Sequence, residues 1–296
     1  MLKLGVIGFS PGNGHPFSWS AIFNGYQPEL IDECGYPTIG QYLSKEDFPE
    51  AQLGTAVVTH AWSQDFERSQ FLARCCHIGT VAKSLPEMVE SVDAVLLARD
   101  DAENHFDLAR LFLEFGIPVF VDKPFALSRS EGRKIYEAGA SPALVYSTAA
   151  TAHASELRLT PDQEATVGRI EYVECLVPNS WDQYSIHAID PLLNILNTSV
   201  VGETRRTVAG SLNILDVEFF EPQVSCRIVA TGKRDTPIGI RIWGTEGSVE
   251  LKFTDTFKAF RASLAEFVEI AAGRLPPQAP EHVLRRIDLV EAGRGQ

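Results

Sequence analysis

The first half of the chain alternates short apolar runs with amphipathic stretches. The apolar runs, which we expect to form buried strands, cover 2–9, 56–62, 93–98, 117–121 and 143–146. The amphipathic stretches, which we expect to form helices, cover 17–26, 65–74, 103–115 and 128–139. An irregular stretch at 35–54 is interpreted as an insertion in the first crossover. Strands alternating with helices at this spacing predict a doubly wound parallel sheet.

After about Thr148 the pattern changes to strands with few helices between them. The expected strands cover 168–177, 207–212, 224–230, 238–243 and 248–253, and helices return at 257–272 and 281–292. Short turns such as 244–247 indicate a largely antiparallel sheet. The fold class is therefore an α/β N-terminal Rossmann domain plus an α+β C-terminal domain with a largely antiparallel open sheet. We expect the first domain at 1–148 to bind a dinucleotide, and the second at 149–296 to bind substrate and mediate oligomerisation.

Composition narrows the classes of partner. The 296 residues carry 39 acidic against 26 basic side chains, a formal net charge of -13 that repels phosphate backbones and anionic lipid. We therefore expect no nucleic-acid partner and no membrane partner. The chain has no apolar run of eighteen residues and no signal-peptide pattern, and its five cysteines are scattered without a metal-binding spacing. These features predict a soluble cytoplasmic protein with reduced thiols and no metal.

A glycine-rich loop follows the first strand. Glycines without a Cβ let backbone N–H groups approach a pyrophosphate at a helix N-terminus. The strict G-x-G-x-x-G pattern would need glycine at two positions occupied by other residues, so the loop is longer or differently wound; a turn without a ligand is the alternative. The cofactor-binding candidates in this loop are Gly8, Ser10, Gly12, Asn13, Gly14 and His15.

Cofactor choice stays open at the end of the second strand. An acidic residue there normally holds the ribose 2′-hydroxyl of NAD. This chain has the neutral Ser63 at that position, Asp65 lies a residue or two too late for the role, and no arginine directly follows. Both NAD and NADP therefore remain candidates.

Lys123 is the most informative single position. It follows the apolar run 119–121 and precedes Pro124, at the carboxyl end of an expected parallel strand, where open α/β sheets bind their ligands. A lysine there can donate to a substrate hydroxyl and stabilise the oxygen as it gains negative charge. The alternative is a solvated lysine at a strand end.

A histidine lies among polar and aromatic residues at an expected helix start. At helical spacing Gln183, His187 and Asp190 share one face. A histidine so placed can take a hydroxyl proton while hydride leaves the same carbon, since its ordinary pKa is close to neutral. The alternative is a structural His187 bonded to Asp190.

Together these features resemble the glucose-fructose oxidoreductase and inositol dehydrogenase family (Gfo/Idh/MocA) over nearly the whole chain. Residues 122–124 are similar to its Glu-Lys-Pro motif, 187–190 to its His-x-x-Asp element, 98–105 to its third-strand segment ending in histidine, and 244–247 to its Gly-Thr-x-Gly turn. The resemblance implies NAD(P)-dependent hydride transfer to or from a secondary alcohol of a sugar, polyol or sugar derivative. It makes Lys123 and His187 the catalytic pair, and adds Arg99, Asp122 and Lys123 to the cofactor contacts.

The expected substrate site departs from the family pattern. Family dehydrogenases commonly carry aspartate four residues before the histidine, and this chain has Gln183 there. Asp182, Tyr184 or Asn179 could orient a hydroxylated substrate instead, and the rings of Trp181 and Tyr184 could stack on a sugar face.

Three functional hypotheses remain from the sequence. The first is the dehydrogenase, and the second is a family-derived binding or regulatory protein that has lost turnover. The third, redox-assisted cleavage of a glycosidic bond with tightly held NAD, lacks motif support. In each case the resemblance implies a homodimer or homotetramer, and the expected sheet face with few covering helices favours the same.

Overall fold

The computed structural model describes residues 1–197 and 201–294, which form two compact units. The first unit contains residues 1–126, 130–147 and 260–280. The second contains residues 127–129 and 148–259 and the segment from Glu281 onward. None of the described helices is long and apolar enough to cross a membrane.

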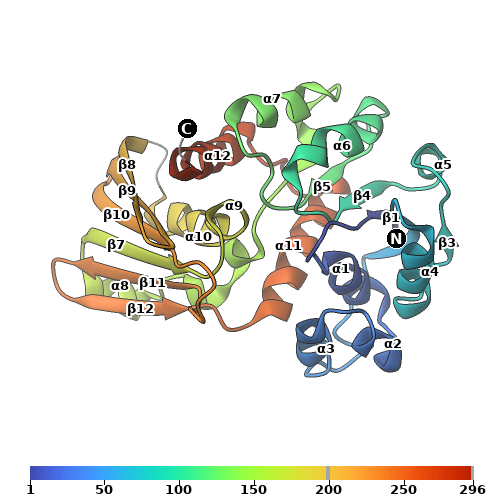
Figure 1. Cartoon of the computed structure of the whole chain (residues 1–296), viewed down its shortest axis with the longest axis horizontal. Coiled ribbons are helices and arrows are strands. Elements are labelled where there is room, and N and C mark those ends of the chain that lie inside the picture. Colours follow the sequence, from blue (N-terminus) through green and yellow to red (C-terminus); the bar gives the residue numbers. More distant parts are fainter. Residues whose placement is uncertain (198–200, 295–296) are drawn as a thin grey trace. The chain divides into compact units, whose positions relative to one another are not determined.

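The first unit is built on a six-stranded parallel sheet (Figure 1). Its strands are β1 (Leu2–Ile7), β2 (Ala56–Trp62), β3 (Thr80–Val81), β4 (Ala94–Leu97), β5 (Val119–Val121) and β6 (Val145–Tyr146). The order is β3-β2-β1-β4-β5-β6 and every neighbouring pair is parallel. The chain winds outward from β1 in one direction and from β4 in the other, which confirms the doubly wound sheet. The reversal between β1 and β4 is the switch point where such sheets bind ligands.

Helices accompany this sheet, and one of them comes from far along the chain. They are α1 (His15–Asn24), α2 (Pro28–Asp32), α3 (Pro37–Leu43), α4 (Phe66–Cys75), α5 (Pro86–Val89), α6 (His105–Glu114), α7 (Arg129–Glu137) and α11 (Thr256–Ala271). The sequence prediction placed α11 in the second domain. In the structure, Phe267 of α11 packs against Phe120 and Tyr146, with ring centroids 5.5 and 5.8 Å apart. The aromatic face of α11 thus completes the core of the first unit.

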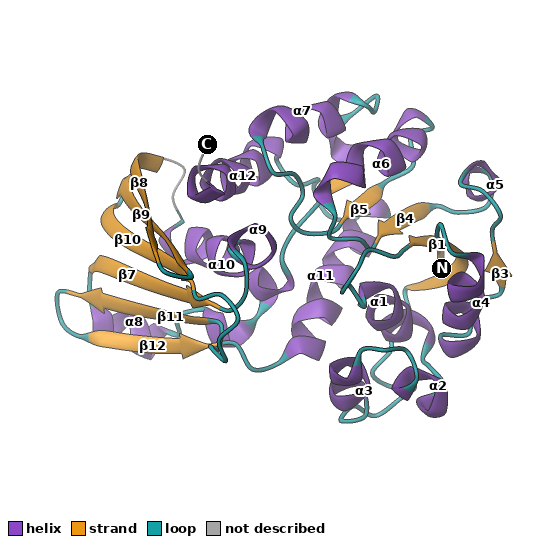
Figure 2. Cartoon of the chain, in the orientation of Figure 1, coloured by secondary structure: helices purple, strands orange, loops and turns teal. Residues whose placement is uncertain are grey.

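The second unit contains a separate six-stranded sheet (Figure 2). Its strands are β7 (Ile170–Val177), β8 (Val201–Ala209), β9 (Leu212–Phe220), β10 (Gln223–Ala230), β11 (Gly239–Gly244) and β12 (Ser248–Lys252). The order is β12-β11-β7-β10-β9-β8, and every pair except β7 with β10 is antiparallel. The largely antiparallel sheet expected from the sequence is confirmed.

One expected strand of this sheet is wrong. The sequence prediction drew a single strand over 207–212, but the chain reverses there between β8 and β9, with Gly210 at φ +64°. The apolar pattern failed because β8 is exposed along most of its length and carries polar side chains such as Glu203, Arg205 and Arg206. An exposed edge strand has no buried face to show a period of two.

Short helical elements cover one face of this sheet. They are α8 (Pro161–Val167), α9 (Trp181–Tyr184), α10 (Ile186–Leu196) and α12 (Pro280–Arg294), with 3₁₀ turns at Ala150–His153 and Ser155–Leu157. Figure 2 shows α10 against the sheet, and the side chains of β7 that are buried there include Val173, Cys175 and Val177. The opposite face carries the adjacent rings of Tyr172 and Trp243, which are only partly buried.

Candidate functional site

The aromatic core of the first unit fixes the segment that carries Lys123. Phe120 of β5 lies between Trp19 of α1 and Tyr146 of β6, with ring centroids 4.7 and 4.9 Å away. Each such ring pair contributes about 1 kcal/mol beyond its buried area. Three residues further on, at the carboxyl end of β5, Lys123 is 7% exposed. The packing of Phe120 therefore holds Lys123 at the edge of the sheet.

The Lys123 ammonium group has a carboxylate neighbour. Its Nζ lies 3.9 Å from Oδ2 of Asp100, which follows β4. Asp100 in turn accepts a hydrogen bond of 2.5 Å from the hydroxyl of Ser10, which follows β1. The loops after β1, β4 and β5 are thus linked through side chains at the switch point.

Asp122 is fully buried beside Lys123 and bonded to the glycine-rich loop. Its Oδ2 lies 2.5 Å from Nδ1 of His15 and accepts a 3.0 Å hydrogen bond from Nδ2 of Asn13. Its Oδ1 accepts a 2.7 Å bond from the backbone N–H of Lys123. Burial by itself raises the pKa of this carboxyl, but the neighbouring charges of His15 and Lys123 and the side-chain hydrogen bonds outweigh burial. The net effect is a pKa below the usual range for aspartate.

The glycine-rich loop has the expected helix behind it, but the donors at the start of α1 are engaged or missing. The N–H of His15 donates to Oδ1 of Asn13 at 2.7 Å, Pro16 has no N–H, and the N–H of Phe17 bonds the carbonyl of Gly14. Gly12 differs: it has φ +82°, is exposed, and a Cβ there would meet nothing within 4 Å. Open access for a ligand therefore lies at Gly12.

Two further glycines of this segment are required by packing. A Cβ on Gly8 would come within 2.6 Å of the Pro16 ring, and one on Gly14 within 2.6 Å of Ile39. Distances below 3 Å force a neighbour to move. Gly8 and Gly14 thus allow the loop and α1 to pack closely.

The expected ribose-reading position faces inward. Ser63 is 6% exposed, and its hydroxyl bonds the carbonyl of Asp65 and the hydroxyl of Ser69 at 2.7 Å each. These bonds hold the start of α4. The side chain of the next residue, Gln64, bonds other loops instead. Its Nε2 donates to the carbonyl of Phe9, and its Oε1 accepts a 2.7 Å hydrogen bond from Arg99.

Arg99 lies in a polar cluster that sequence reasoning did not anticipate. Its guanidinium binds Asp101 through Nε and Nη2 at 2.9 and 2.5 Å. Burial tends to raise the pKa of Asp101, but its hydrogen bonds with Arg99 and Asn104 lower it overall. The only sequence signal for Asp100 and Asp101 is their place in the loop after β4.

His105, the histidine of the third-strand resemblance, is fully buried between two loops. Its ring nitrogens lie 2.8 Å from the carbonyl of Arg99 and 3.0 Å from the carbonyl of Phe125. It therefore braces the loop after β4 against the loop after β5.

The second unit divides the helix face that the sequence predicted. Gln183 lies on α9, whereas His187 and Asp190 lie on α10, and Ser185 separates the two helices. The ring of Tyr184 lies against that of His187, with centroids 5.3 Å apart. The fully buried Asp190 bonds Nε of Arg286 at 2.5 Å and the N–H of Ala149 at 2.6 Å. Asp190 therefore anchors α10 to α12 and to the 3₁₀ turn at 150–153.

The expected substrate residues have different environments. Trp181 is 3% exposed, its Nε1 donates to the carbonyl of Val290 at 2.8 Å, and a Cβ on Gly293 would overlap its ring. The expected stacking of Trp181 on a sugar does not agree with this burial, because α12 covers the ring. Tyr184 is only partly buried.

Asn179, Asp182 and Gln183 are more accessible than Trp181. Asp182 pairs with Arg294 at 3.1 Å, and Gln183 accepts a hydrogen bond from the hydroxyl of Ser180. Asn179 has φ +58° and its backbone pairs with Gly232. Lys123 belongs to the first unit and His187 to the second, and their convergence remains a prediction. Across residues 1–197 and 201–294, no group of three or more His, Cys, Asp or Glu side chains is arranged to hold a metal ion.

Comparison with known proteins bears on the Rossmann unit first. The sequence model of an oxidoreductase family with an NAD-binding Rossmann fold, the Gfo/Idh/MocA family, matches residues 35–149. The resemblance to this family is confirmed over residues 35–149. The match begins after β1, the glycine-rich loop and α1. The backbone N–H groups at the start of α1 are the ones that are already bonded or, at Pro16, absent. No curated protein sequence matches the chain significantly.

Solved structures show a similar fold over nearly the whole chain. The chain superposes on scyllo-inositol dehydrogenase from Lactobacillus casei with a TM-score of 0.72 at 14% identity, over 99% of this chain and 94% of that one. The superposition on myo-inositol 2-dehydrogenase from Lactobacillus plantarum has a TM-score of 0.71 at 12% identity, over 99% of this chain and 96% of that one. The superposition on UDP-N-acetylglucosamine 3-dehydrogenase from Acidithiobacillus ferrooxidans has a TM-score of 0.67 at 16% identity, over 97% of this chain and 94% of that one.

Proposed function

We propose that the chain is an NAD(P)-dependent oxidoreductase that transfers hydride to or from a secondary alcohol of a sugar, polyol or sugar derivative. The observation that carries the proposal is the position of Lys123. A buried ammonium group, held by Asp100 at the carboxyl end of β5, lies beside the switch point of a Rossmann sheet whose family binds NAD. Similarity in fold to two inositol dehydrogenases and a nucleotide-sugar dehydrogenase supports this substrate class.

The residues at the switch point fit a dinucleotide whose phosphate contacts differ from the usual contacts at a helix N-terminus. Gly12 offers open backbone, and the side chains of Ser10, Asn13 and His15 lie beside it in the loop. The N-terminus of α1 contributes little, because Asn13 occupies the N–H of His15 and Pro16 lacks one. We therefore assign the pyrophosphate contacts to the loop backbone around Gly12. The bound nicotinamide would supply or accept the hydride.

Lys123 has the task of polarising the reacting oxygen. Its charge favours the alkoxide-like oxygen that develops as hydride moves, and a pre-positioned cation gains most where water is excluded. Asp100 keeps the ammonium in place from one side. His187 would take the hydroxyl proton in oxidation and return it in reduction, with the ring of Tyr184 limiting its rotation.

The direct experiment combines cofactor binding with turnover. NADH and NADPH are titrated by fluorescence, and hydride transfer is followed at 340 nm with inositols and with UDP-N-acetylglucosamine as probe substrates. The proposal expects dinucleotide binding and turnover of at least one hydroxylated probe that is lost in Lys123→Ala. Failure to bind either dinucleotide would overturn it.

The second candidate is a binding or regulatory protein of the same family without turnover. The engaged donors at the start of α1 and the exposed Gln183 in place of the usual aspartate favour it. Dinucleotide that co-purifies with the protein, seen by native mass spectrometry, together with inactivity towards the whole substrate panel would support this candidate.

We further propose a homodimer or homotetramer in the cytoplasm. The partly exposed Tyr172 and Trp243 and the 56% exposed Phe220 lie on one face of the second sheet among charged side chains such as Arg227, and we infer that a partner covers these rings. All five cysteines are free thiols, which fits a reducing compartment. Light scattering at micromolar concentration tests the first point, and a mass of 32.6 kDa would contradict it.

A further inference from the structure

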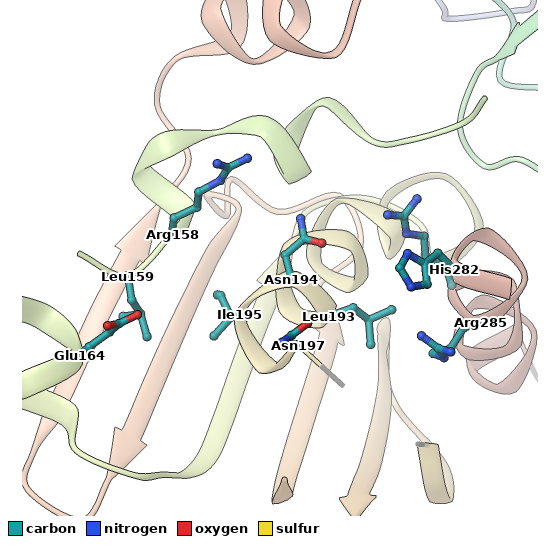
Figure 3. A pocket seen from close by; sticks show the side chains of 10 residues that line it. Arg158, Leu159, Glu164, Leu193, Asn194, Ile195, Asn197, His282 and Arg285 are labelled. Carbon is teal, nitrogen blue, oxygen red and sulfur yellow. The ribbon is translucent and has the colours of Figure 1, made fainter. Parts of the chain in front are cut away.

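A pocket of about 460 Å³ lies within the second unit, and no step of the proposed reaction uses it. Its wall comes from the chain just before and within α8, from the last turns of α10 and from the first turns of α12. Figure 3 shows Arg158 on one side of Asn194 and His282 on the other, with Arg285 on the same helix as His282. The volume falls within the range of small-molecule sites.

The charge of this wall is opposite to that of the whole chain. Three arginines, Arg158, Arg285 and Arg286, line the pocket together with one carboxylate, Glu164. The balance is 3 − 1 = +2, in a chain with 39 acidic and 26 basic side chains. Asp190 is bonded to Arg286, so counting it leaves +1.

Neighbouring carboxylates are directed to other partners. Glu281 and Asp288 of α12 bind the guanidinium of Arg129 at 2.5 and 2.6 Å. Glu156, two residues before Arg158, accepts hydrogen bonds from the backbone N–H groups of Thr254 and Asp255. These acids therefore neutralise other groups or cap backbone, and the positive balance of the pocket persists.

The pKa values of two histidines are lowered in part by these arginines. Burial, then the charges of Arg285 and Arg286, lower the pKa of His282. Burial, then Arg158 and Arg286, lower the pKa of His153 to about 4. Arg286 thus acts on both histidines, while Arg158 acts on His153 and Arg285 acts on His282.

We propose that this pocket binds a small polyanion carrying phosphate or carboxylate groups. Arginine presents a planar fork that matches both groups with paired, charge-assisted hydrogen bonds. The amide of Asn194, whose Nδ2 donates to the carbonyl of Ala152, lies between the two charged sides and adds polar contact for the ligand. The site is distinct from the proposed hydride-transfer residues, because Asn194 lies seven residues along α10 from His187, about 10 Å at the helical rise of 1.5 Å per residue.

The test uses the full-length protein and two probe anions, inorganic pyrophosphate and citrate. Isothermal titration calorimetry is run at constant low ionic strength with saturating NADH, so that the dinucleotide loop does not contribute. We expect one site per chain, and about a tenfold or greater loss of affinity in each of Arg158→Gln and Arg285→Gln. Tighter pyrophosphate binding assigns the ligand to phosphate esters, and tighter citrate binding assigns it to polycarboxylates.

A matched control and a local reporter complete the test. Arg169→Gln removes a guanidinium with a 78% exposed side chain outside the pocket, and it should leave the affinity unchanged. The imidazole NMR signals of His282 should shift on anion binding while those of His60 in β2 do not. The proposal fails if neither anion binds at millimolar concentration, or if binding survives both pocket substitutions. If NADH does not bind, the proposed oxidoreductase function fails, but loss of anion affinity in the two pocket variants still supports the anion site.

Discussion

Asp122 in the first unit and Asp190 in the second are both fully buried, yet the pKa values of their carboxyl groups are shifted in opposite directions. Burial raises the pKa of each. At Asp122 the charges of His15 and Lys123 reverse this effect, whereas at Asp190 burial prevails over Arg286 and the N–H of Ala149. Two equally buried carboxyl groups can therefore differ in the free energy needed to ionise them. The number of positive charges and hydrogen-bond donors around each group decides the difference.

The same contrast extends to the two groups of candidate residues. In the first unit, Ser10, Asp100 and Lys123 are buried or nearly so and linked across three loops. In the second unit, Gln183 is exposed and Asp182 half-exposed. The groups that we propose to stabilise charge are thus buried and bonded, while the side chains that we propose to select a substrate are exposed and can vary without disturbing the core.

The largest expected effect is on turnover. Lys123→Ala and His187→Ala should each lower kcat by about a thousandfold or more, because each removes a group that acts only as charge or proton moves. The affinity for NADH should change little, since we assign the phosphate contacts to the loop around Gly12. Steady-state kinetics and fluorescence titration measure the two quantities separately. Equal loss of kcat and of NADH affinity would assign Lys123 to cofactor binding.

The next effect is on stability and its pH dependence. Asp122→Asn should lower the free energy of unfolding at pH 7 by about 3 kcal/mol, because it leaves buried positive groups without their partner. The folded pKa of Asp122 is lowered, so its contribution is present above the unfolded pKa of about 3.9 and is lost as pH falls through the folded value. Urea unfolding between pH 3 and 7 measures the difference between wild type and variant.

Asp190→Asn provides the opposite control. The folded pKa of Asp190 is raised, so its contribution is present below the unfolded pKa and is lost as pH rises through the folded value. The stability difference between wild type and Asp190→Asn should therefore shrink with rising pH, and that of Asp122→Asn should grow. Parallel pH profiles for the two variants would refute the contrast between the two carboxyls.

Cofactor selectivity should be smaller still. Ser63 turns its hydroxyl towards α4, and Gln64 offers neither a carboxylate to a 2′-hydroxyl nor a positive charge to a 2′-phosphate. NADH and NADPH should differ in dissociation constant by less than about a hundredfold, which is two decades of 1.4 kcal/mol each. Fluorescence titration of both cofactors decides this, and a larger ratio would mean that another residue reads the ribose.

The smallest effect concerns the exposed glutamine. Gln183→Asp should leave kcat equal or higher by a few-fold and leave the melting temperature unchanged, since the side chain is exposed and its hydrogen bond is local. If Asp182 or Tyr184 has taken over the role of the usual aspartate, Asp182→Asn or Tyr184→Phe will be the damaging change. Kinetics of the three variants side by side separate the two cases.

The sequence predicted the elements whose burial is regular. The expected strand at 117–121 shows an apolar run and the expected helix at 103–115 shows a helical period, and β5 and α6 begin and end within two residues of these bounds. The hairpin at 210–211 was missed because β8, its first strand, is exposed along most of its length and carries no such period. The packing of α11 on Phe120 was also not predictable, because periodicity shows that a helix has an apolar face but not what covers it.

The candidate site divides in the same way. Lys123 could be assigned from its place after an apolar strand. The bonds of Asp122 with His15 and Asn13 could not, because they join residues more than a hundred positions apart. Trp181 shows the converse error: an aromatic residue next to a candidate histidine suggested a ligand contact, and only the position of α12 shows that its ring is buried.

The return of α11 to the first sheet has a consequence for synthesis of the protein on the ribosome. Residues 1–147 emerge first and contain every strand of the parallel sheet, but Phe120 and Tyr146 lack the cover of Phe267 until residue 267 has also been made. The nascent first unit therefore displays an uncovered aromatic surface while more than a hundred further residues are added. Its core closes only after α11 has been made, so the first unit cannot finish folding before most of the second unit has also been synthesised.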